Sequence, residues 1–294
     1  MTNSLPKLIF MSLLLMGAHV LAEVALLEEI RNLRLQGRLD DARLLADREL
    51  EAGELDQQLA IELNLELARI LDRSGLHTNT RPVAAALEHL EAAQSLLEPP
   101  NLAGRAAVEL GLAYYYYRAE MAGREFQIAT THVQRAIVLF SQLADESGEA
   151  DAVHLLGLIK LQSGNLQEAR ELFEQSLTLD KAGANRVWFR GEYERHVGYV
   201  LQTSGDRLAA IPYFKRSLVA RLEAGAIDAS MFAALTLAES QFVLGDLGDA
   251  AINAEYALSI GERISSPVGK ARATDLIERI KENKKDAQDE LESN

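Results

Sequence analysis

Residues 150–177 read ADAVHLLGLIKLQSGNLQEARELFEQSL, and this stretch predicts two helices joined by a tight turn. Apolar residues recur at helical spacing before the turn and again after it. Gly164 ends the first helix, because glycine tolerates the left-handed conformation that terminates helices. Asn165 is then suited to be the N-cap of the second helix, with Glu168 three residues further on. The pair has an apolar face that it cannot bury alone, so a neighbouring pair must cover it.

The same pattern returns twice further along the chain, at intervals of 41 and 40 residues. Each copy has a small residue in the first helix, a glycine in the turn, then an alanine and an aromatic or small residue in the second helix. The small residue of the first helix is Gly157, Gly198 or Ala238, and the turn glycine is Gly164, Gly205 or Gly245. In the second helix the alanine is Ala169, Ala210 or Ala250, and the aromatic or small residue is Phe173, Phe214 or Ala254. A fixed period in this range predicts a solenoid of stacked helical hairpins. We expect the small residues where two helices cross closely, with the phenylalanines between them.

These residues resemble the tetratricopeptide repeat. That family has a Leu-Gly pair, a glycine-containing turn, an alanine, an aromatic residue and a small residue, in this order. The first copy follows the order with Leu156-Gly157, Gly164, Ala169, Phe173 and Ser176. The family's tryptophan position is filled by Val153, Glu194 and Ala234 in the three copies, and the period exceeds the usual length of about 34 residues. The resemblance implies an all-α fold, an α-solenoid of about six helical hairpins that offers a surface to partners.

The chain divides into four segments on this interpretation. Residues 1–22 predict a secretory signal peptide, since Lys7 gives a positive start, an apolar run follows, and small residues mark a cleavage site. The repeats extend over 23–263. Residues 264–280 predict a helix that caps the apolar end of the stack. Residues 281–294 are charged and predict a frayed or disordered tail.

The composition adds an expected location and excludes some classes of partner. The chain has no cysteine and no Asn-x-Ser/Thr sequence, which fits a bacterial periplasm better than a eukaryotic secretory lumen. The apolar run near the N-terminus is short for a membrane span. We therefore expect a periplasmic protein with no stable membrane anchor after cleavage of the signal peptide. A net charge of −14 argues against nucleic acid or anionic lipid as a general partner.

Residue patterns that carry chemistry are missing from the sequence. The histidines form no i, i+4 pair of the zinc-binding type, and neither a G-x-S-x-G nor a G-x-G-x-x-G motif occurs. Gly269-Lys270 resembles part of a phosphate loop, but Ala271 replaces the required Ser or Thr. The sequence therefore predicts a protein that is not an enzyme, with no catalytic residue, cofactor or metal.

Four consecutive tyrosines, Tyr114–Tyr117, cover about 300° of a helix, because each residue turns the chain by about 100°. They cannot all face one core. Tyr114 matches the packing tyrosine in the Leu-Gly-x-x-Tyr pattern of the family that the chain resembles. At least one of the other three is expected on the surface or in a binding groove, where tyrosine is favoured. The alternative is that they pack against the longer loop near residues 119–124.

In the family that this sequence resembles, the first helix of each pair lines the concave face. Carrying that register over predicts the following partner-binding residues: Arg31, Arg34, Arg69, Arg73, Arg105, Tyr115, Tyr116, Arg195 and Tyr199. Arginine pairs with carboxylates and stacks on aromatic rings, so the expected partner is an acidic segment or a chain terminus. The alternative is that the first four arginines pair with neighbouring carboxylates on a solvated face. Those carboxylates are Glu62, Glu66 and Asp72.

The sequence as a whole predicts a non-catalytic scaffold or adaptor for protein–protein interactions in the cell envelope, binding a partner segment in its concave groove. Two alternatives stay open. One is a protein that binds polysaccharide or a cell-wall polymer, whose affinity would fall with salt. The other is a subunit that activates a separate enzyme and is inert alone.

Overall fold

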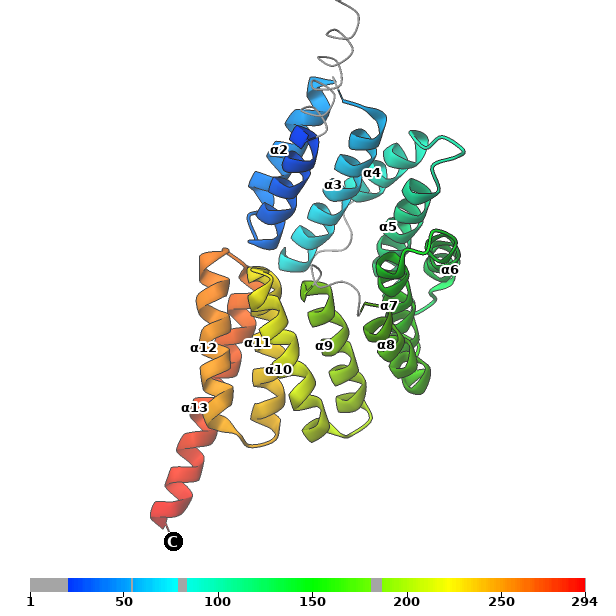
Figure 1. Cartoon of the computed structure of the whole chain (residues 1–294). Coiled ribbons are helices and arrows are strands. Elements are labelled where there is room, and N and C mark those ends of the chain that lie inside the picture. Colours follow the sequence, from blue (N-terminus) through cyan, green and yellow to red (C-terminus); the bar gives the residue numbers. More distant parts are fainter. Residues whose placement is uncertain (1–20, 54, 79–83, 181–186, 294) are drawn as a thin grey trace, which may run out of the picture.

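The computed structural model describes residues 21–53, 55–78, 84–180 and 187–293, and within these ranges it contains helices and connecting turns but no strand (Figure 1). Residues 21–35 form the first described helix. The later helices are α2 (Leu39–Ala52), α3 (Gln57–Thr78), α4 (Ala84–Ser95), α5 (Leu102–Glu120), α6 (Gln127–Gln142), α7 (Glu146–Gln162), α8 (Leu166–Leu179), α9 (Val187–Thr203), α10 (Arg207–Glu223), α11 (Ile227–Val243), α12 (Leu247–Arg263) and α13 (Pro267–Ser293).

These helices pair in sequence order into six hairpins, from helix 21–35 with α2 to α11 with α12, and α13 follows alone. The first helix of one hairpin packs on the first helix of the next, as α3 does on α5, α5 on α7 and α7 on α9. The α13 helix packs against both helices of the last hairpin. The predicted all-α solenoid of six hairpins with a C-terminal capping helix is thus confirmed.

The turns inside the hairpins use glycine in the left-handed region. Gly164, Gly205 and Gly245 have φ of 83°, 92° and 81°, where other L-residues are strained. The next residue is the N-cap of the second helix. The side chain of Asp206 accepts a hydrogen bond from the backbone N–H of Ala209, whereas Asn165 takes the same position without a capping side-chain bond. The turn geometry therefore matches the sequence pattern, while the cap itself varies between hairpins.

Small and large residues complement one another where the two helices of a hairpin cross. A Cβ atom added to Gly157 would lie 2.6 Å from the ring of Phe173, and one added to Gly198 would lie 2.5 Å from the ring of Phe214. Both rings are buried. In the α11–α12 hairpin the phenylalanine is replaced by Ala254, and the glycine by Ala238, also buried. A larger residue on one helix thus goes with a smaller one on the other.

The three alanines at the repeated position of the second helix, Ala169, Ala210 and Ala250, are fully buried. They belong to hydrophobic clusters that extend from hairpin to hairpin. Each hairpin thus covers the apolar face of the one before it, as a helical solenoid requires.

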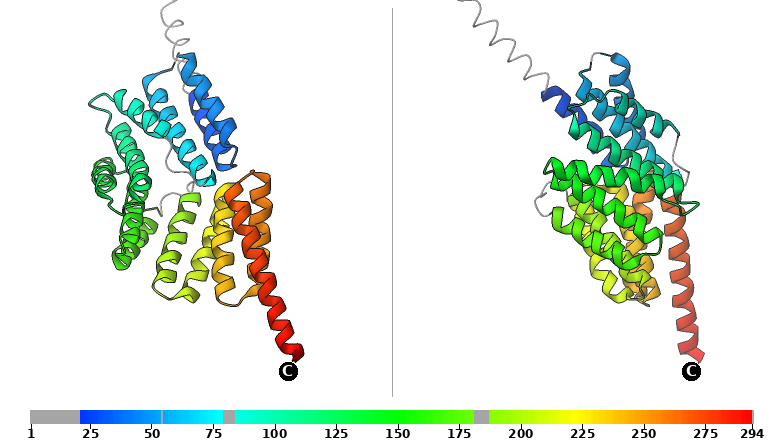
Figure 2. Two further views of the ribbon diagram at one scale, coloured as in Figure 1. Left: turned by 180° about the vertical axis from the view of Figure 1, so that it is seen from behind. Right: turned by 90° about the vertical axis from the view of Figure 1, so that its right-hand side faces the viewer.

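The stack curves until its last helices lie beside its first ones. Figures 1 and 2 show the chain passing from α2 through α5 and α9 and returning with α12 and α13 below α2. The last helix, α13, packs against α3 of the second hairpin. The turn at Gly37 meets the end of α12, because a Cβ atom built there would lie 3.1 Å from Cγ2 of Ile264. The described helices therefore form a ring, and we call the side on which the first helices face one another its inner face.

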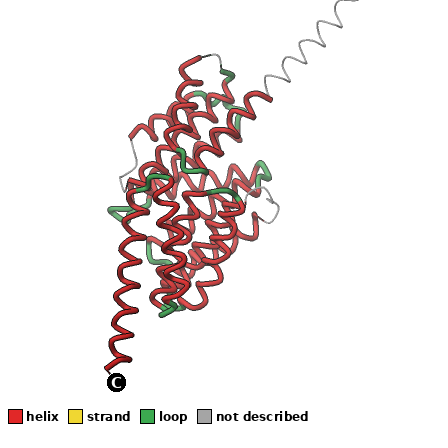
Figure 3. Tube along the Cα trace, turned by 90° about the vertical axis from the view of Figure 1, so that its left-hand side faces the viewer, coloured by secondary structure: helices red, strands yellow, loops and turns green. Residues whose placement is uncertain are grey.

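The α13 helix extends well past the stack that it caps (Figures 1 and 3). It continues as helix to Ser293, although the sequence of residues 281–294 predicts a frayed or disordered tail. Residues 281–286 are exposed, so this part of the helix leaves the body of the protein. No described helix is long and apolar enough to cross a membrane.

Candidate partner-binding site

Three arginines converge on one glutamate at the start of the ring. Glu66 on α3 is 1% exposed in its side chain. Its Oε1 lies 3.1 Å from Nε of Arg31 and 2.6 Å from an amino nitrogen of Arg69, and its Oε2 lies 3.1 Å from Nε of Arg34. Burial alone would raise the pKa of Glu66, but the three guanidinium groups outweigh it and lower the pKa to about 2. Glu66 is therefore a carboxylate at neutral pH.

A second charged group joins the two ends of the ring. Nε of Arg73 on α3 lies 2.6 Å from Oδ2 of Asp228 on α11, and the Asp228 side chain is fully buried. His77 lies one turn further along α3, with its Nε2 3.5 Å from the same oxygen. Its Nδ1 is 3.0 Å from Oγ of Ser266, just before α13. This group therefore contacts the second hairpin, the sixth hairpin and the capping helix together.

A third group surrounds Glu192 on α9. Its two carboxylate oxygens lie 2.6 Å from a guanidinium nitrogen of Arg221 and 2.7 Å from one of Arg195. Burial alone would raise the pKa of Glu192, but the two arginines hold it well below its usual range. The guanidinium of Arg195 also stacks on Tyr199, 5.1 Å from the ring centroid. Arg221 is almost fully buried and donates to the backbone carbonyl of Ala229 on α11.

Two buried histidines line this third group. His154 Nε2 lies 2.8 Å from Nδ1 of His196. Since Arg195 donates to Nε2 of His196, the proton of the His196 ring is on Nδ1, where His154 Nε2 and, at 2.9 Å, the backbone carbonyl of Glu192 are its acceptors. Burial lowers the pKa of His154 to about 3, and burial with the adjacent Arg195 lowers that of His196 well below its usual range. Both rings are therefore neutral at pH 7.

The three groups act on one another across the ring. The charge of Glu192 attracts Arg73, and Asp151 on α7 attracts Arg69. Asp228 acts in the same way on Arg34, which belongs to the first helix. The inner face is therefore one continuous charged surface, rich in arginine, inside a chain whose net charge is −14.

Six of the nine predicted binding residues lie in this surface, and three do not. The six are Arg31, Arg34, Arg69, Arg73, Arg195 and Tyr199. Tyr116 instead stacks on His132 of α6, with ring centroids 5.5 Å apart, and Tyr115 packs edge-on against Tyr116. Arg105 is exposed and lies one helical turn before Glu109, which pairs with the same His132. On α5 the register carried over from the family thus brings Tyr116 to the second helix α6 and Tyr115 near Glu91 of α4, away from the charged groups of the inner face.

Tyr117 and Arg118 come closer to the inner face than the two tyrosines before them. Tyr117 packs on Phe126, and burial raises its pKa to about 12. Arg118 pairs with Asp72 of α3 and donates to the Asp72 backbone carbonyl at 2.7 Å. Among the four tyrosines, the one expected to be exposed is therefore not Tyr117, which belongs to the main core.

The alternative pairing predicted from sequence holds in part. Arg31, Arg34 and Arg69 do pair with Glu66, and Arg31 also pairs with Glu62 at 3.0 Å. However, the central carboxylate is buried rather than solvated. Asp72 pairs with a different arginine, from the next hairpin.

Sequence reasoning missed Glu192, Arg221 and Asp228, which complete the second and third groups. A signal was present, because Arg221 and Asp228 interrupt the apolar pattern of α10 and α11 at positions that are buried. Buried charges are rare unless they are paired. Their partners come from other hairpins, so the sequence did not reveal the pairs.

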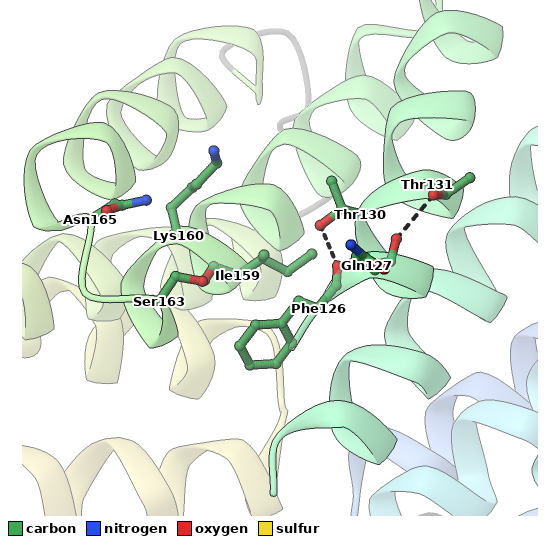
Figure 4. Close-up of a pocket in the computed structure, with 8 residues that line it drawn as sticks. All are labelled: Phe126, Gln127, Thr130, Thr131, Ile159, Lys160, Ser163 and Asn165. Atoms are coloured by element: carbon green, nitrogen blue, oxygen red, sulfur yellow. Dashed lines mark hydrogen bonds between the residues drawn. The ribbon is translucent and has the colours of Figure 1, made fainter. Parts of the chain in front are cut away.

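A separate depression of about 530 Å³ lies between the start of α6 and the α7–α8 turn (Figure 4). Its lining residues are Phe126, Gln127, Thr130, Thr131, Ile159, Lys160, Ser163 and Asn165. The three hydroxyl groups donate to backbone carbonyls of their own helices, and Lys160 pairs with Glu168 at 2.9 Å. Most of its polar groups thus already have partners, and the inner face is the stronger candidate site. No cluster suited to a metal ion occurs among the described residues.

Comparison with known protein families identifies one repeat of this helical solenoid. A tetratricopeptide-repeat family model matches residues 150–182. A search of curated proteins finds no match to the sequence. The chain is thus a helical-repeat solenoid in which residues 150–182 match the tetratricopeptide repeat.

Three solved structures illustrate the likeness of fold. NprR in complex with its cognate peptide NprX has a TM-score of 0.65 and 12% identity, over 99% of this chain and 84% of that one. A Rap protein complexed with Competence and Sporulation Factor has a TM-score of 0.59 and 18% identity, over 92% and 74%. The signal transduction ATPase PH0952 of Pyrococcus horikoshii, which has a tetratricopeptide-repeat sensor, has a TM-score of 0.54 and 18% identity, over 75% and 33%.

Proposed function

We propose that this protein is a non-catalytic scaffold that binds a protein partner through a segment held on the inner face. The observation that carries the proposal is the set of partly exposed arginines at the edge of the buried charge groups. Arg69 is 48% exposed and Arg31 is 43% exposed, while each contributes only part of its guanidinium to Glu66. Arginine has five N–H donors, so both retain donors for a ligand.

An acidic segment or a chain terminus is the proposed ligand. A carboxylate would receive paired hydrogen bonds from a guanidinium group, with Tyr199 and Arg195 offering a stacked aromatic surface nearby. The Rap protein was solved with Competence and Sporulation Factor and NprR with its cognate peptide NprX, which supports a peptide segment as the kind of partner. The rigid helices would be in place before binding, which limits the entropy lost on association.

Site-specific photo-crosslinking tests the proposal in cells that express the protein. A photoreactive amino acid at Arg69 or Tyr199 should give discrete protein adducts, identified by mass spectrometry. The same amino acid at Leu208, which is exposed on the second helix α10, is the control. Adducts that arise equally from all three positions would contradict inner-face binding.

A charge reversal tests the role of arginine. Arg69→Glu should abolish adducts from Tyr199, whereas Arg170→Glu should leave them unchanged. Arg170 is a matched control, because it is also partly exposed and also pairs with a glutamate within its own helix, α8. If Arg69→Glu has no effect but excess acidic polysaccharide removes the adducts, the inner face binds a polymer instead.

We also propose that the protein works in the cell envelope, most simply the periplasm. The support is the N-terminal sequence, with its positive start, apolar run and small-residue cleavage site. Fractionation of cells and the intact mass of the purified protein test this. A protein that retains Met1 and stays with the cytosol would overturn the proposal.

A further inference from the structure

We propose that Arg73, His77, Asp228 and Ser266 form a latch that holds the ring closed, and that release of this latch exposes the inner face to a partner. The consequence for binding rests on the proposed function. The latch itself does not, and it is tested without any partner.

The position of the four residues in the sequence is the first argument. Arg73 and Asp228 are 155 residues apart, and His77 and Ser266 are 189 residues apart. A helical solenoid is held together by contacts between neighbouring repeats. These contacts instead join the second hairpin to the sixth hairpin and to α13. They are therefore additional to what the stack requires, and they determine whether the ring is closed.

Polar contacts connect the cap of α13 to the ion pair of the latch. Oγ of Ser266 accepts the backbone N–H of Gly269 at 3.2 Å and so caps α13. Its hydroxyl proton is then free to point at Nδ1 of His77. Nε2 of His77 then faces Oδ2 of Asp228 at 3.5 Å, and Nε of Arg73 contacts the same oxygen. The cap of the last helix is thus linked to the ion pair of the joint.

An apolar contact on each side of these polar groups completes the joint. The ring of His77 packs on that of Phe232, with centroids 5.6 Å apart. The turn at Gly37 lies against Ile264 and against Cβ of Asp228. The attraction within a buried ion pair is largely offset by the desolvation of its charges. The joint is therefore specific in geometry without being strong, which suits a contact that opens.

Closure also restricts access to the inner face. Asp228 is fully buried, and the groups that it meets, Arg73 of α3 and the turn at Gly37, come from the other end of the ring. An incoming carboxylate would compete with Asp228 for Arg73. Binding of an acidic segment and opening of the ring would thus favour each other.

The first test measures the shape of the ring. Because the protein has no cysteine, Arg43→Cys on α2 and Glu255→Cys on α12 can carry two spin labels at exposed positions. The distance distribution between them should be narrow in the parent protein and gain a longer component in Asp228→Asn. The matched control is Glu194→Gln, which removes a buried partner of Arg216 inside the α9–α10 hairpin. It should leave the distribution unchanged.

The second test measures access. A cysteine at Tyr199 should react with a maleimide about tenfold faster in Asp228→Asn, which corresponds to a tenfold change in the open population. A cysteine at Leu208 on the outside should react at one rate in all variants. A short crosslink between Gln36→Cys and Ser265→Cys, which flank the Gly37–Ile264 contact, should slow the inner reaction again.

Asp228→Asn leaves Arg73 without its buried counter-ion, so circular dichroism must show that helix content is retained. If it is not, His77→Phe combined with Ser266→Ala decides the question, because this variant loosens the joint without isolating a charge. Faster inner labelling and a longer distance in either folded variant support the latch. Unchanged labelling and distances in the folded variants overturn it, whatever the outcome of the partner experiments.

Discussion

Gly198 and Phe214 face each other inside the α9–α10 hairpin, and a Cβ atom on the glycine would lie 2.5 Å from the ring. The same relationship holds between Gly157 and Phe173 one hairpin earlier. The two helices of each hairpin can pack this closely only because the glycine has no Cβ atom.

Gly198→Ala is expected to destabilise the protein by about 1–3 kcal/mol, because the core is overpacked. The cost should be smaller in a Phe214→Ala background, which reproduces the alanine pair of the α11–α12 hairpin. Urea unfolding of the four proteins of this cycle measures the coupling. Gly248→Ala is the control, since a Cβ atom there meets its nearest neighbour only at 4.0 Å. Additive effects would contradict the proposed contact.

Glu66→Gln is expected to lower the free energy of unfolding by about 3–5 kcal/mol. The change leaves three guanidinium groups without the carboxylate that they share, and breaking a buried ion pair by removing one partner is costly. Glu174→Gln removes the exposed partner of Arg170 and should cost at most about 1 kcal/mol. Denaturant titration at pH 7 compares the two variants. Equal losses would mean that the arginines around Glu66 are solvated.

Acid should remove the contribution of Glu66. Its pKa in the folded protein is about 2, below the ordinary value of 4.5. A carboxyl group with a lowered folded pKa stabilises the protein above its unfolded pKa and loses this effect as the pH falls toward the folded pKa. The stability difference between wild type and Glu66→Gln is therefore expected to shrink between pH 4.5 and 2. A difference that is constant with pH would contradict this assignment.

His154 should make the protein sensitive to mild acid. Its pKa is about 3 in the folded protein and 6.5 by reference, so the unfolded chain binds a proton that the folded protein rejects. The contribution of neutral His154 to the free energy of unfolding is fully present above pH 6.5. It falls as the pH drops, by on the order of 2 kcal/mol at pH 5. Glutamine keeps an acceptor for His196 and does not titrate. The loss of stability between pH 7 and 5 should thus be smaller in His154→Gln, and an unchanged loss would refute the prediction.

Tyr116→Ala is expected to lower stability without affecting binding at the inner face. The half-buried ring stacks on His132 of α6, so its removal costs about 1–3 kcal/mol. Thermal unfolding measures the stability, and adduct formation from Tyr199 measures binding at 10 °C below the variant's transition, roughly where it is still folded. If the variant keeps its stability but no longer forms adducts from Tyr199, Tyr116 takes part in binding, and the prediction is wrong.

The positions that repeat along the chain were predictable because the forces on them are local. A glycine turn, an N-cap position and a small residue facing an aromatic ring all lie within one hairpin, as Gly164, Asn165, Gly157 and Phe173 do. The sequence spacing therefore predicts both helices and their contact.

The candidate site was predictable only on those helices where the register of the repeat pattern also fixes which side chains face inward. On helix 21–35, α3 and α9, the predicted arginines reach the inner face. On α5, Tyr115 and Tyr116 contact the second-helix side instead of the charged groups of the inner face. The pairs Arg73–Asp228 and Arg221–Glu192 join different helices, and a single sequence gives no measure of such distances.

Closure of the ring has a consequence for how the molecule comes apart. In an open array each end frays first, since a terminal repeat has one neighbour and its loss leaves the others intact. Here the second hairpin is tied to the sixth and to α13. Melting of the C-terminal end therefore also removes contacts from the N-terminal end. While the latch is closed, the two ends should therefore unfold together instead of each fraying alone.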